Sequence, residues 1–455
     1  VGTNALLEGR GARTALVATE GFTDVLELRR QDRAHLYRLS DRHPPPLVSP
    51  QEHVGVTERV GAEGVLIPLA EEEIRRVVEA VAERDPESVA VGLLFSFAHP
   101  EHERRLTEAL RRRLPGVHVT GSAELMPEIR EYERISTAAV DAYLTPVVGR
   151  YLGRLEDACD PAGLPRPDIM LSNGGVLPID AAAEHAALTV LSGPAGGVIG
   201  AAALARSAGE EMVLTFDMGG TSTDVALVMD GAPGRAPGST IAGHPVHLPV
   251  LDIETVSAGG GSIAWADSGG ALRVGPRSAG ARPGPAGYGR GGRDATVTDA
   301  NIVLGRIDVS DPLSGEVALH RDAAQAAVGR LGEELGLDTP TCAEGIIAVA
   351  VQEMVAALRT VSVERGVDPR QATLVAFGGA GPLHACAVAD ELGCPRVLVP
   401  PAAGMLAAAG LAAAPIRRDL VQTVLLDVRA SEELGRVRRD LRDRAHDAVP
   451  GGRLG

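Results

Sequence analysis

The segment DMGGTSTDV, residues 217–225, is the feature that most constrains the fold of this chain. It lies between two short apolar runs, VLTF (213–216) and VALVM (225–229), which are typical of buried strands. Gly219 and Gly220 permit a tight turn with exposed backbone N–H groups. The pattern therefore predicts a strand, a turn and a second strand, whereas a Rossmann or Walker site requires a strand, a loop and a helix.

A hairpin of this composition is able to hold the phosphates of a nucleotide with backbone amides and side-chain hydroxyls, and it needs no lysine. The alternative is a plain β-hairpin, whose turn needs one or two glycines but neither flanking carboxylates nor three successive hydroxyls. The residues predicted to contact phosphates are Gly219, Gly220, Thr221, Ser222 and Thr223.

A second glycine-rich segment, FGGAGPLHA (377–385), follows the apolar run 373–377. Its glycines allow a ligand to approach the backbone, and the helix expected from Pro382 offers its N-terminus to an anion or a nucleotide edge. A simple turn between a strand and a helix explains the segment equally well. His384 either contacts the ligand or packs in the core. The predicted ligand contacts here are Gly378, Gly379, Gly381 and His384.

A third segment of small residues is LSGPAGGVIGAAALA, residues 191–205. It predicts a helix that packs closely against a phosphate loop or against another element, with or without a ligand. Ser192 and Gly193, at its start, are the residues expected to contact a ligand.

The composition excludes several kinds of site, because all 44 basic residues are arginine and there is no lysine. A Walker lysine, a protein-kinase lysine and a Schiff-base lysine are therefore absent. A net charge of −16 and 2% aromatic residues argue against a nucleic-acid surface. The uncharged stretches 189–205 and 400–416 are too short and too weakly apolar to span a bilayer, so we expect no membrane association. The scattered cysteines indicate reduced thiols in the cytoplasm, and they are Cys159, Cys342, Cys386 and Cys394.

Alternating strand and helix patterns predict an α/β architecture with mixed sheets. We expect a first domain over 1–190, a second over 191–420, and the start of a further region over 421–455. Because the chain begins at Val1 rather than Met and ends in a charged segment, we expect a fragment truncated at both ends. Predicted strands include 15–19, 89–97 and 396–400, and predicted helices include 74–83, 101–114, 124–158 and 343–364.

Long motifs in the same order along the chain resemble the hydantoinase A / 5-oxoprolinase family, which belongs to the actin-like ATPase superfamily and also includes the ATP-binding subunit of acetone carboxylase. The resemblance covers the chain to about residue 419. It implies a two-domain, ribonuclease H-like fold around ATP. The motifs are VATEGFTDVLELRRQ (17–31), EYERISTAAVDAYL (131–144), LSNGGVLP (171–178), SGPAGG (192–197), DMGGTSTDV (217–225), AGGGSIAW (258–265), TVTDANIVLGR (296–306) and FGGAGPLHA (377–385).

The resemblance implies that residues 217–224 form the family's second phosphate hairpin, that 378–384 form its adenosine-side motif, and that 192–197 form its interdomain connection. The family's first phosphate hairpin is expected upstream of Val1. The chain departs from the family at Asp141, where Asn is usual, and at Ser257, where Gly is frequent.

The implied activity is ATP-dependent opening of a cyclic amide such as a hydantoin or 5-oxoproline, by phosphoryl transfer to the amide. A hydantoinase B-type subunit or fused domain is the implied partner in a hetero-oligomer. The alternatives are an ATP-dependent carboxylase subunit and a non-catalytic nucleotide-binding module.

Asp217 is the candidate ligand of Mg²⁺, directly or through water. Asp224 either positions the nucleophile or caps the turn. Since lysine is absent, an arginine must supply any fixed cation. Arg134 is the catalytic candidate and Arg30 a second one, and each has a surface ion pair as its alternative.

A metal site formed by His244, His247, Asp252 and Glu254 is disfavoured, because residues three apart on a strand face opposite sides. Asp299 is a possible further ligand from elsewhere in the chain. The segment AGGGSIA (258–264) is expected to build a tight turn that faces the substrate.

Overall fold

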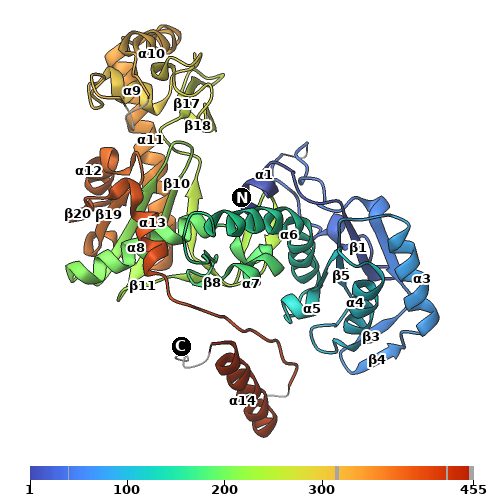
Figure 1. Cartoon of the computed structure of the whole chain (residues 1–455). Helices are drawn as coiled ribbons and strands as arrows, with labels where there is room; N and C mark the ends of the chain where they lie inside the picture. Colours follow the sequence, from blue (N-terminus) through green and yellow to red (C-terminus); the bar gives the residue numbers. More distant parts are fainter. Residues whose placement is uncertain (39, 313–316, 427–428, 450–455) are drawn as a thin grey trace. The chain divides into compact units, whose positions relative to one another are not determined.

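The computed structural model describes residues 1–38, 40–312, 317–426 and 429–449. The chain forms two compact units (Figure 1). The first contains Val1–Ser192, Arg235–Val250 and the described residues from Pro415 onward. The second contains Gly193–Gly234 and Leu251–Ala414.

The first unit is built on a parallel sheet with the strand order β2-β1-β5-β6. Side chains alternate along β1: Ala15 and Val17 pack on the side of α3 and α4, whereas Leu16 and Ala18 pack against α6. Helices therefore cover both faces, as is usual for parallel sheets. The elements are β1 (Thr14–Thr19), β2 (His53–Val56), β5 (Ser88–Gly92), β6 (His118–Gly121), α3 (Glu71–Ala82), α4 (Glu101–Arg113) and α6 (Glu131–Cys159).

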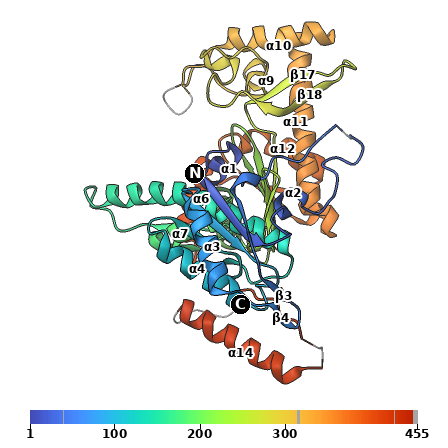
Figure 2. The same cartoon turned by 90° about the vertical axis from the view of Figure 1, so that its right-hand side faces the viewer.

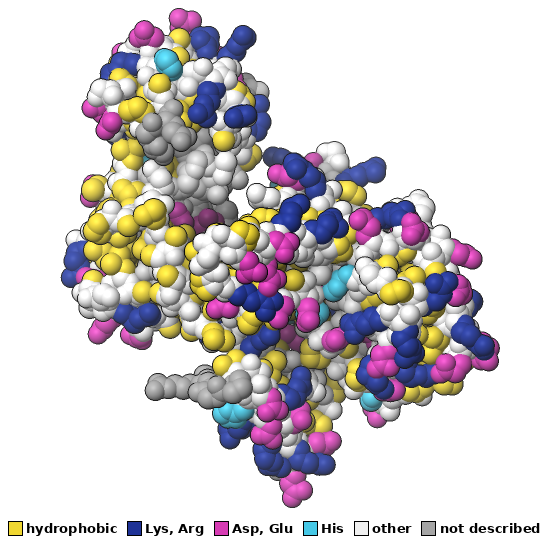
Figure 3. All heavy atoms as spheres, in the orientation of Figure 1, with side chains coloured by type: hydrophobic (Ala, Val, Ile, Leu, Met, Phe, Trp, Pro, Cys, Tyr) yellow, Lys and Arg dark blue, Asp and Glu magenta, His cyan; other side chains and the backbone are white. Residues whose placement is uncertain are grey.

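The outer face of α3 and α4 is covered with side chains of both charges (Figure 3). Arg113 Nε lies 3.0 Å from Glu79 Oε1, and Arg105 pairs with Glu71. Such exposed ion pairs contribute little to stability, and they mark the face as solvated.

The C-terminal half of α6 belongs to a second hydrophobic cluster of the first unit, in which Leu144, Val148 and Leu152 pack with α1 and α7. The remaining elements of this unit are α1 (Gly2–Leu7), α2 (Val25–Leu28), β3 (Arg59–Gly61), β4 (Gly64–Ile67), α5 (Ser122–Leu125), β7 (Asp168–Met170), β8 (Val176–Pro178), α7 (Ile179–Glu184), β12 (Arg235–Ala236), β13 (Ser239–Ile241), β14 (His244–Val246) and α14 (Ser431–Ala448).

Two predictions for the first unit are wrong in their bounds. The strand expected over 89–97 ends at Gly92, because the N–H of Leu93 donates to Glu103 Oε2 and Phe95 turns with φ 56°. The helix expected over 124–158 is two helices, α5 and α6, separated by a segment that contains Pro127.

The second unit is built on a mixed sheet with the order β11-β10-β9-β19-β20, to which β16 adds beside β10. The strands β9 and β10 are antiparallel, whereas β9, β19 and β20 run parallel. The expected α/β architecture with mixed sheets is thus confirmed. The elements are α8 (Ser192–Ala208), β9 (Met212–Met218), β10 (Thr223–Met229), β11 (Ala232–Pro233), β16 (Ile253–Val256), α11 (Thr339–Val361), β19 (Thr373–Phe377), α12 (Gly381–Leu392), β20 (Arg396–Leu398) and α13 (Leu406–Ala413).

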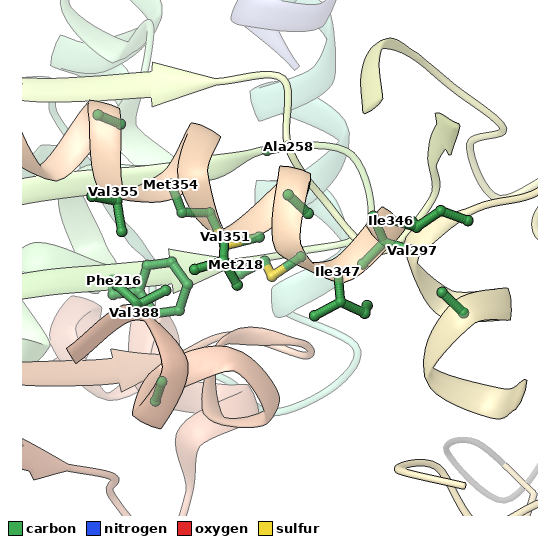
Figure 4. Close-up of a cluster of buried hydrophobic side chains, with 14 of the residues drawn as sticks. Phe216, Met218, Ala258, Val297, Ile346, Ile347, Val351, Met354, Val355 and Val388 are labelled. Carbon is green, nitrogen blue, oxygen red and sulfur yellow. The ribbon is translucent and has the colours of Figure 1, made fainter. Parts of the chain in front are cut away.

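The core of the second unit lies between this sheet and the helices α11 and α12. Figure 4 shows Phe216 and Met218 of β9 packed with Met354 of α11 and Val388 of α12. The region 339–365, which contains α11, is long and apolar enough to cross a membrane by length and composition. Since Met354 and Leu358 are fully buried in this core, the apolar character of α11 is explained by packing.

The expected turn-rich region includes β17 (Ser262–Ala266) and β18 (Leu272–Ser278). In Figure 2 this hairpin lies beside α9 (Val297–Val303) and α10 (Arg321–Leu335), next to one end of α11. Strand β15 (Val250–Leu251) spans the boundary between the units.

Candidate functional site

The segment 217–225 forms the predicted hairpin. In the ladder between β9 and β10, Met218 lies opposite Thr223 and Asp217 lies opposite Asp224. The turn is closed by a hydrogen bond of 3.0 Å from the N–H of Gly219 to the carbonyl of Ser222. We call residues 217–224 the phosphate hairpin.

The tip of the phosphate hairpin presents free hydrogen-bond donors. Gly220 and Thr221 are exposed, and Ser222 is half-buried. Within the part of the chain that the structure describes, the N–H groups of these three residues and the hydroxyls of Thr221 and Ser222 donate no hydrogen bond. A cluster of amides and hydroxyls without partners fits the oxygen atoms of a nucleotide's phosphates.

The three glycine-rich segments meet at the carboxylate of Asp217. Gly378 has φ 81°, and a Cβ atom there would collide with Asp217 Oδ1. A Cβ atom on Gly197 of α8 would lie 3.1 Å from Asp217 Oδ2 and 2.7 Å from a ring carbon of Phe377. The carboxylate therefore lies between the backbone of α8 and the turn after β19, and a larger residue on either side would displace it.

The two carboxylates of the hairpin occupy opposing positions on neighbouring strands, where Cβ atoms are about 5 Å apart. Burial and the charge of Asp224 raise the pKa of Asp217 to about 6. Burial also raises the pKa of Asp224, although its hydrogen bond from Thr255 Oγ1, 2.5 Å long, opposes this shift. Among the described residues, neither carboxylate has an arginine or histidine in an ion pair. Oxygen ligands with uncompensated charge suit Mg²⁺.

The other predicted contacts lie at the start of α8 and around the turn that leads into α12. The N–H of Ala380 donates to the carbonyl of Met218, which fixes the turn before α12 against β9. Gly379 and Gly193 are exposed, and a Cβ atom on either would meet nothing within 4 Å. Gly381 is buried against the backbone of β9. Ser192 is the first residue of α8.

Two predicted nucleotide contacts are buried instead. The hydroxyl of Thr223 donates to the carbonyl of Ala258, so its side chain supports the turn from behind. His384 is 1% exposed, and its Nε2 lies 3.3 Å from Nδ2 of the buried Asn301. Burial, with a contribution from Arg306, lowers the pKa of His384 to about 4. Of the alternatives for His384, the structure favours packing.

Arg134, the predicted catalytic arginine, lies in the first unit and is fully buried. Its guanidinium donates to Ser122 Oγ, to the carbonyl of Glu128 and to the carbonyl of Leu93 at 3.1, 3.1 and 2.7 Å. Desolvation lowers its pKa, and Glu103 and Glu131 oppose this effect. Arg134 does form an ion pair along α6, since its Nη2 lies 3.7 Å from Glu131 Oε1, but this pair is not on the surface because Arg134 is fully buried. Its other donors serve the interior of the first unit.

Arg30, the second candidate cation, does form the surface ion pair that was considered for it. Its Nε donates to Glu133 Oε1 at 2.8 Å, and its Nη2 also contacts the same carboxylate. This pair joins the segment after α2 to the start of α6.

The possible metal ligands do not form a cluster in the described residues, which contain no group of three or more His, Cys, Asp or Glu side chains able to hold an ion. Asp252 pairs with Arg365. Asp299 caps α9 and accepts hydrogen bonds from Gly287 and Thr296. The pKa of His244 is lowered to about 4 by burial and by Arg29.

The segment 258–264 was expected to build a tight turn that faces the substrate. Its first residues pack against the phosphate hairpin, where the N–H groups of Gly260 and Gly261 donate to the carbonyls of Gly219 and Gly220 at 3.0 and 2.7 Å. The three successive glycines were the signal for such a close backbone approach.

Comparison with protein families gives two matches that together cover most of the chain. The family model described as hydantoinase/oxoprolinase matches residues 134–420, and the one described as hydantoinase/oxoprolinase N-terminal region matches residues 1–114.

Among curated proteins, the alpha subunit of caprolactamase from Pseudomonas jessenii is 37% identical over 98% of this chain and 65% of its own length. The 5-oxoprolinase 1 of Arabidopsis thaliana is 37% identical over 92% of this chain and 36% of its own length. The chain spans 64% and 65% of the first two curated relatives and as little as 34% of others.

Two solved structures are similar over almost the whole chain. The ATP-dependent caprolactamase of P. jessenii matches with a TM-score of 0.88 and 36% identity over 99% of this chain and 67% of its own. Nucleotide-free acetone carboxylase matches with a TM-score of 0.78 and 28% identity over 98% of this chain and 66% of its own. The architecture of the chain is thus that of the actin-like ATPase fold found in these enzymes.

Proposed function

The chain belongs to the hydantoinase/oxoprolinase family, and we propose that it forms the ATP-binding and phosphoryl-transferring part of an enzyme that opens a cyclic amide. The observation that carries this proposal is the convergence of three glycine-rich segments on Asp217 beside a hairpin with unpaired donors. The cytoplasm, where ATP is supplied, is the expected compartment.

The reaction follows from the chemistry of the amide. Its carbonyl carbon is a poor electrophile toward water. Transfer of the γ-phosphoryl group of ATP to the carbonyl oxygen forms an O–P bond, releases ADP and converts the oxygen into a leaving group. Attack by water on the carbon gives a tetrahedral centre, which expels the ring nitrogen as an amine and leaves an acyl phosphate. A second water then hydrolyses the acyl phosphate, breaking its bond to phosphate and leaving the carboxylate of the ring-opened product. Phosphoryl transfer requires mainly positioning and charge neutralisation.

Each part of the described site has a role in this scheme. The amides of Gly220, Thr221 and Ser222 orient the phosphates. Asp217 and Asp224 are the residues that would hold Mg²⁺, which when bound neutralises phosphate charge. Because Asp217 has a pKa of about 6, it is mostly ionised at neutral pH and is ready to bind a cation. The turn at Gly378 packs against the carboxylate of Asp217 so closely that no side chain fits there.

The class of substrate is proposed from the names of the relatives and not from the shape of a pocket in the structure. Caprolactam and 5-oxoproline are the lactams named by the relatives, and a hydantoin is the cyclic imide of the family name. Relatives that are designated as subunits support an assembly with a second, B-type subunit or fused domain.

An ATP-dependent carboxylase is the second candidate, because a gamma subunit of acetophenone carboxylase is 34% identical to this chain and acetone carboxylase shares its fold. Phosphorylation of a ketone or of bicarbonate would use the same phosphate site. A non-catalytic nucleotide-binding module is the third.

The test is ATP hydrolysis by the full-length protein with its B-type partner. We expect ADP release only when a hydantoin, 5-oxoproline or a lactam is added, with ring-opened product in equal amount. Stimulation by a ketone that requires bicarbonate would establish the carboxylase instead. If the protein binds ATP tightly but no substrate stimulates ATP hydrolysis, the non-catalytic nucleotide-binding module becomes the favoured function.

A further inference from the structure

A second glycine-rich loop packs against the phosphate hairpin. We propose that Thr298 is a positioning residue: it fixes this loop, and the loop fixes the backbone donors that bind the nucleotide phosphates. The inference rests on the proposed function. The loop consists of residues 258–262, which follow β16 and end at the first residue of β17, and we call it the bracing loop.

The bracing loop contacts the hairpin through backbone atoms at successive residues. The N–H groups of Gly260 and Gly261 donate to the carbonyls of Gly219 and Gly220, at 3.0 and 2.7 Å. The hydroxyl of Thr223 donates to the carbonyl of Ala258. These bonds engage two carbonyl groups and one hydroxyl of the hairpin, and they leave the N–H groups of its tip free for a ligand.

The approach of the two loops is too close for any side chain. A Cβ atom on Gly259 would lie 2.6 Å from the backbone nitrogen of Thr221 and 2.7 Å from that of Ser222. These are two of the donors assigned to the phosphates. The position of the bracing loop therefore determines directly where those donors lie.

Thr298 fixes the bracing loop in turn. Both its N–H, at 2.7 Å, and its hydroxyl, at 2.8 Å, donate to the carbonyl of Gly260. The residue is only 7% exposed and lies in the first turn of α9. Its neighbour Asp299 anchors that turn by accepting hydrogen bonds from Thr296 and Gly287. A chain of short hydrogen bonds thus runs from α9 through Gly260 to Gly219.

The decisive variant is Thr298→Val, which keeps the shape of the side chain and removes the hydroxyl donor. In equilibrium titrations of the full-length protein, we expect its Kd for Mg·ATP to rise roughly three- to tenfold. Its Kd for adenosine, which has no phosphate, should stay within about twofold of that of the unmodified protein. Thr298→Ser restores the donor and should restore Mg·ATP affinity.

Thr360→Val is the matched control, because Thr360 also donates its hydroxyl to a carbonyl, that of Ala356, on α11. It should change neither Kd. Gly259→Ala pushes on the hairpin from the same side and should weaken Mg·ATP binding while leaving adenosine binding intact.

Hydrogen exchange of the peptide that contains residues 216–224 separates failure of this inference from failure of the proposed function. Thr298→Val should speed exchange there, and Thr360→Val should not. If the unmodified protein binds no Mg·ATP but this difference in exchange is present, the bracing role holds and the proposed function fails. If Thr298→Val leaves both Mg·ATP affinity and exchange unchanged, or weakens adenosine binding equally, Thr298 is not a positioning residue.

Discussion

Asp217 and Asp224 lie directly opposite each other in the ladder between β9 and β10, so that two carboxylates share one side of the hairpin with no arginine or histidine paired to them in the described structure. Proteins rarely keep such charges unpaired and partly buried without a function. The arrangement costs stability in the absence of a cation and favours binding of one.

Replacing Asp217 by Asn should abolish substrate-dependent ATP turnover, by at least about a hundredfold, because a carboxylate oxygen is lost from the proposed Mg²⁺ site. The melting temperature without Mg²⁺ should not fall, since the substitution also removes repulsion with Asp224. Turnover and thermal unfolding measured on the same preparation check both expectations. Full activity in Asp217→Asn would contradict the assignment of Asp217 as a ligand of Mg²⁺.

The free energy of unfolding should depend on pH in a way that reflects the titration of Asp217. A pKa raised to about 6 means that the native state binds this proton more tightly than the unfolded state, where the pKa is about 3.9. Stability should therefore fall as the pH rises from about 4 to about 6, by on the order of 2 kcal/mol. Denaturant unfolding at successive pH values, without Mg²⁺, measures this slope.

Two comparisons identify the group responsible for that slope. Asp217→Asn should lose most of it and keep the smaller part that comes from Asp224, whose pKa is also raised by burial. With saturating Mg²⁺ the slope should also decrease, because the metal competes with the proton, and Mg²⁺ affinity should decline below about pH 6. An identical slope in all three samples would show that another group titrates.

A third prediction concerns Asp141, which is fully buried in the first unit and accepts hydrogen bonds from Thr120 Oγ1 at 2.9 Å and from the N–H of Ala187 at 3.1 Å. His185 Nδ1 lies 3.0 Å from its carboxylate. Desolvation acts against the charge of Asp141, yet hydrogen bonds with His118 and His185 hold its pKa well below the usual range. Burial likewise opposes protonation of His185, and Asp141 raises its pKa overall.

The sign of each shift gives the pH window. The contribution of Asp141 is present above its unfolded pKa of about 3.9 and is lost as the pH falls through the lower native value. The contribution of His185 is present below about pH 6.5 and is lost as the pH rises through its raised native pKa.

Asp141→Asn should lower the pKa of His185, as followed by NMR of the imidazole, and should remove the change of stability above about pH 6.5. Asp168→Asn, at an exposed position of β7, is the control that should leave both unchanged. A His185 pKa that is the same in Asp141→Asn and in the unmodified protein would contradict the assigned coupling.

A fourth prediction separates a structural from a catalytic Arg134. Arg134→Met should destabilise the protein by about 3–5 kcal/mol, because three hydrogen bonds are lost and Glu103 keeps a buried charge. Arg30→Gln removes only an exposed pair and should cost about 1 kcal/mol or less. Denaturant midpoints measure both. A stable, folded Arg134→Met protein without turnover would return Arg134 to the catalytic residues.

The elements and the hairpin could be predicted from sequence because their signals are local. An apolar run, two glycines and a second apolar run define β9, the turn and β10. The helix at 339–361 was expected over nearly the same range for the same reason. The role of Asp217 as the meeting point of three segments could not be predicted, because a single sequence contains no information on which turns adjoin in space.

The misjudged residues share one property, which is that partners distant in sequence satisfy their polar groups. From the sequence alone, Arg134 was expected on the surface of a helix. In the structure its guanidinium donates to Leu93 and Ser122, which are distant from it in sequence. The contacts of the bracing loop could not be inferred from the sequence, because Thr298, which donates to Gly260 of that loop, lies 38 residues away. Hydrogen bonds between residues so far apart in sequence produce no periodic pattern from which they could be predicted.

The convergence on Asp217 also determines when the site comes into existence during folding. Gly197, Asp217 and Gly378 meet only after β9 has paired with β19, a parallel pairing between segments roughly 160 residues apart. Contacts of such high sequence separation form slowly and late. A chain still emerging from the ribosome would therefore have the hairpin without its surroundings, and nucleotide binding at the proposed site would report that the second unit has folded.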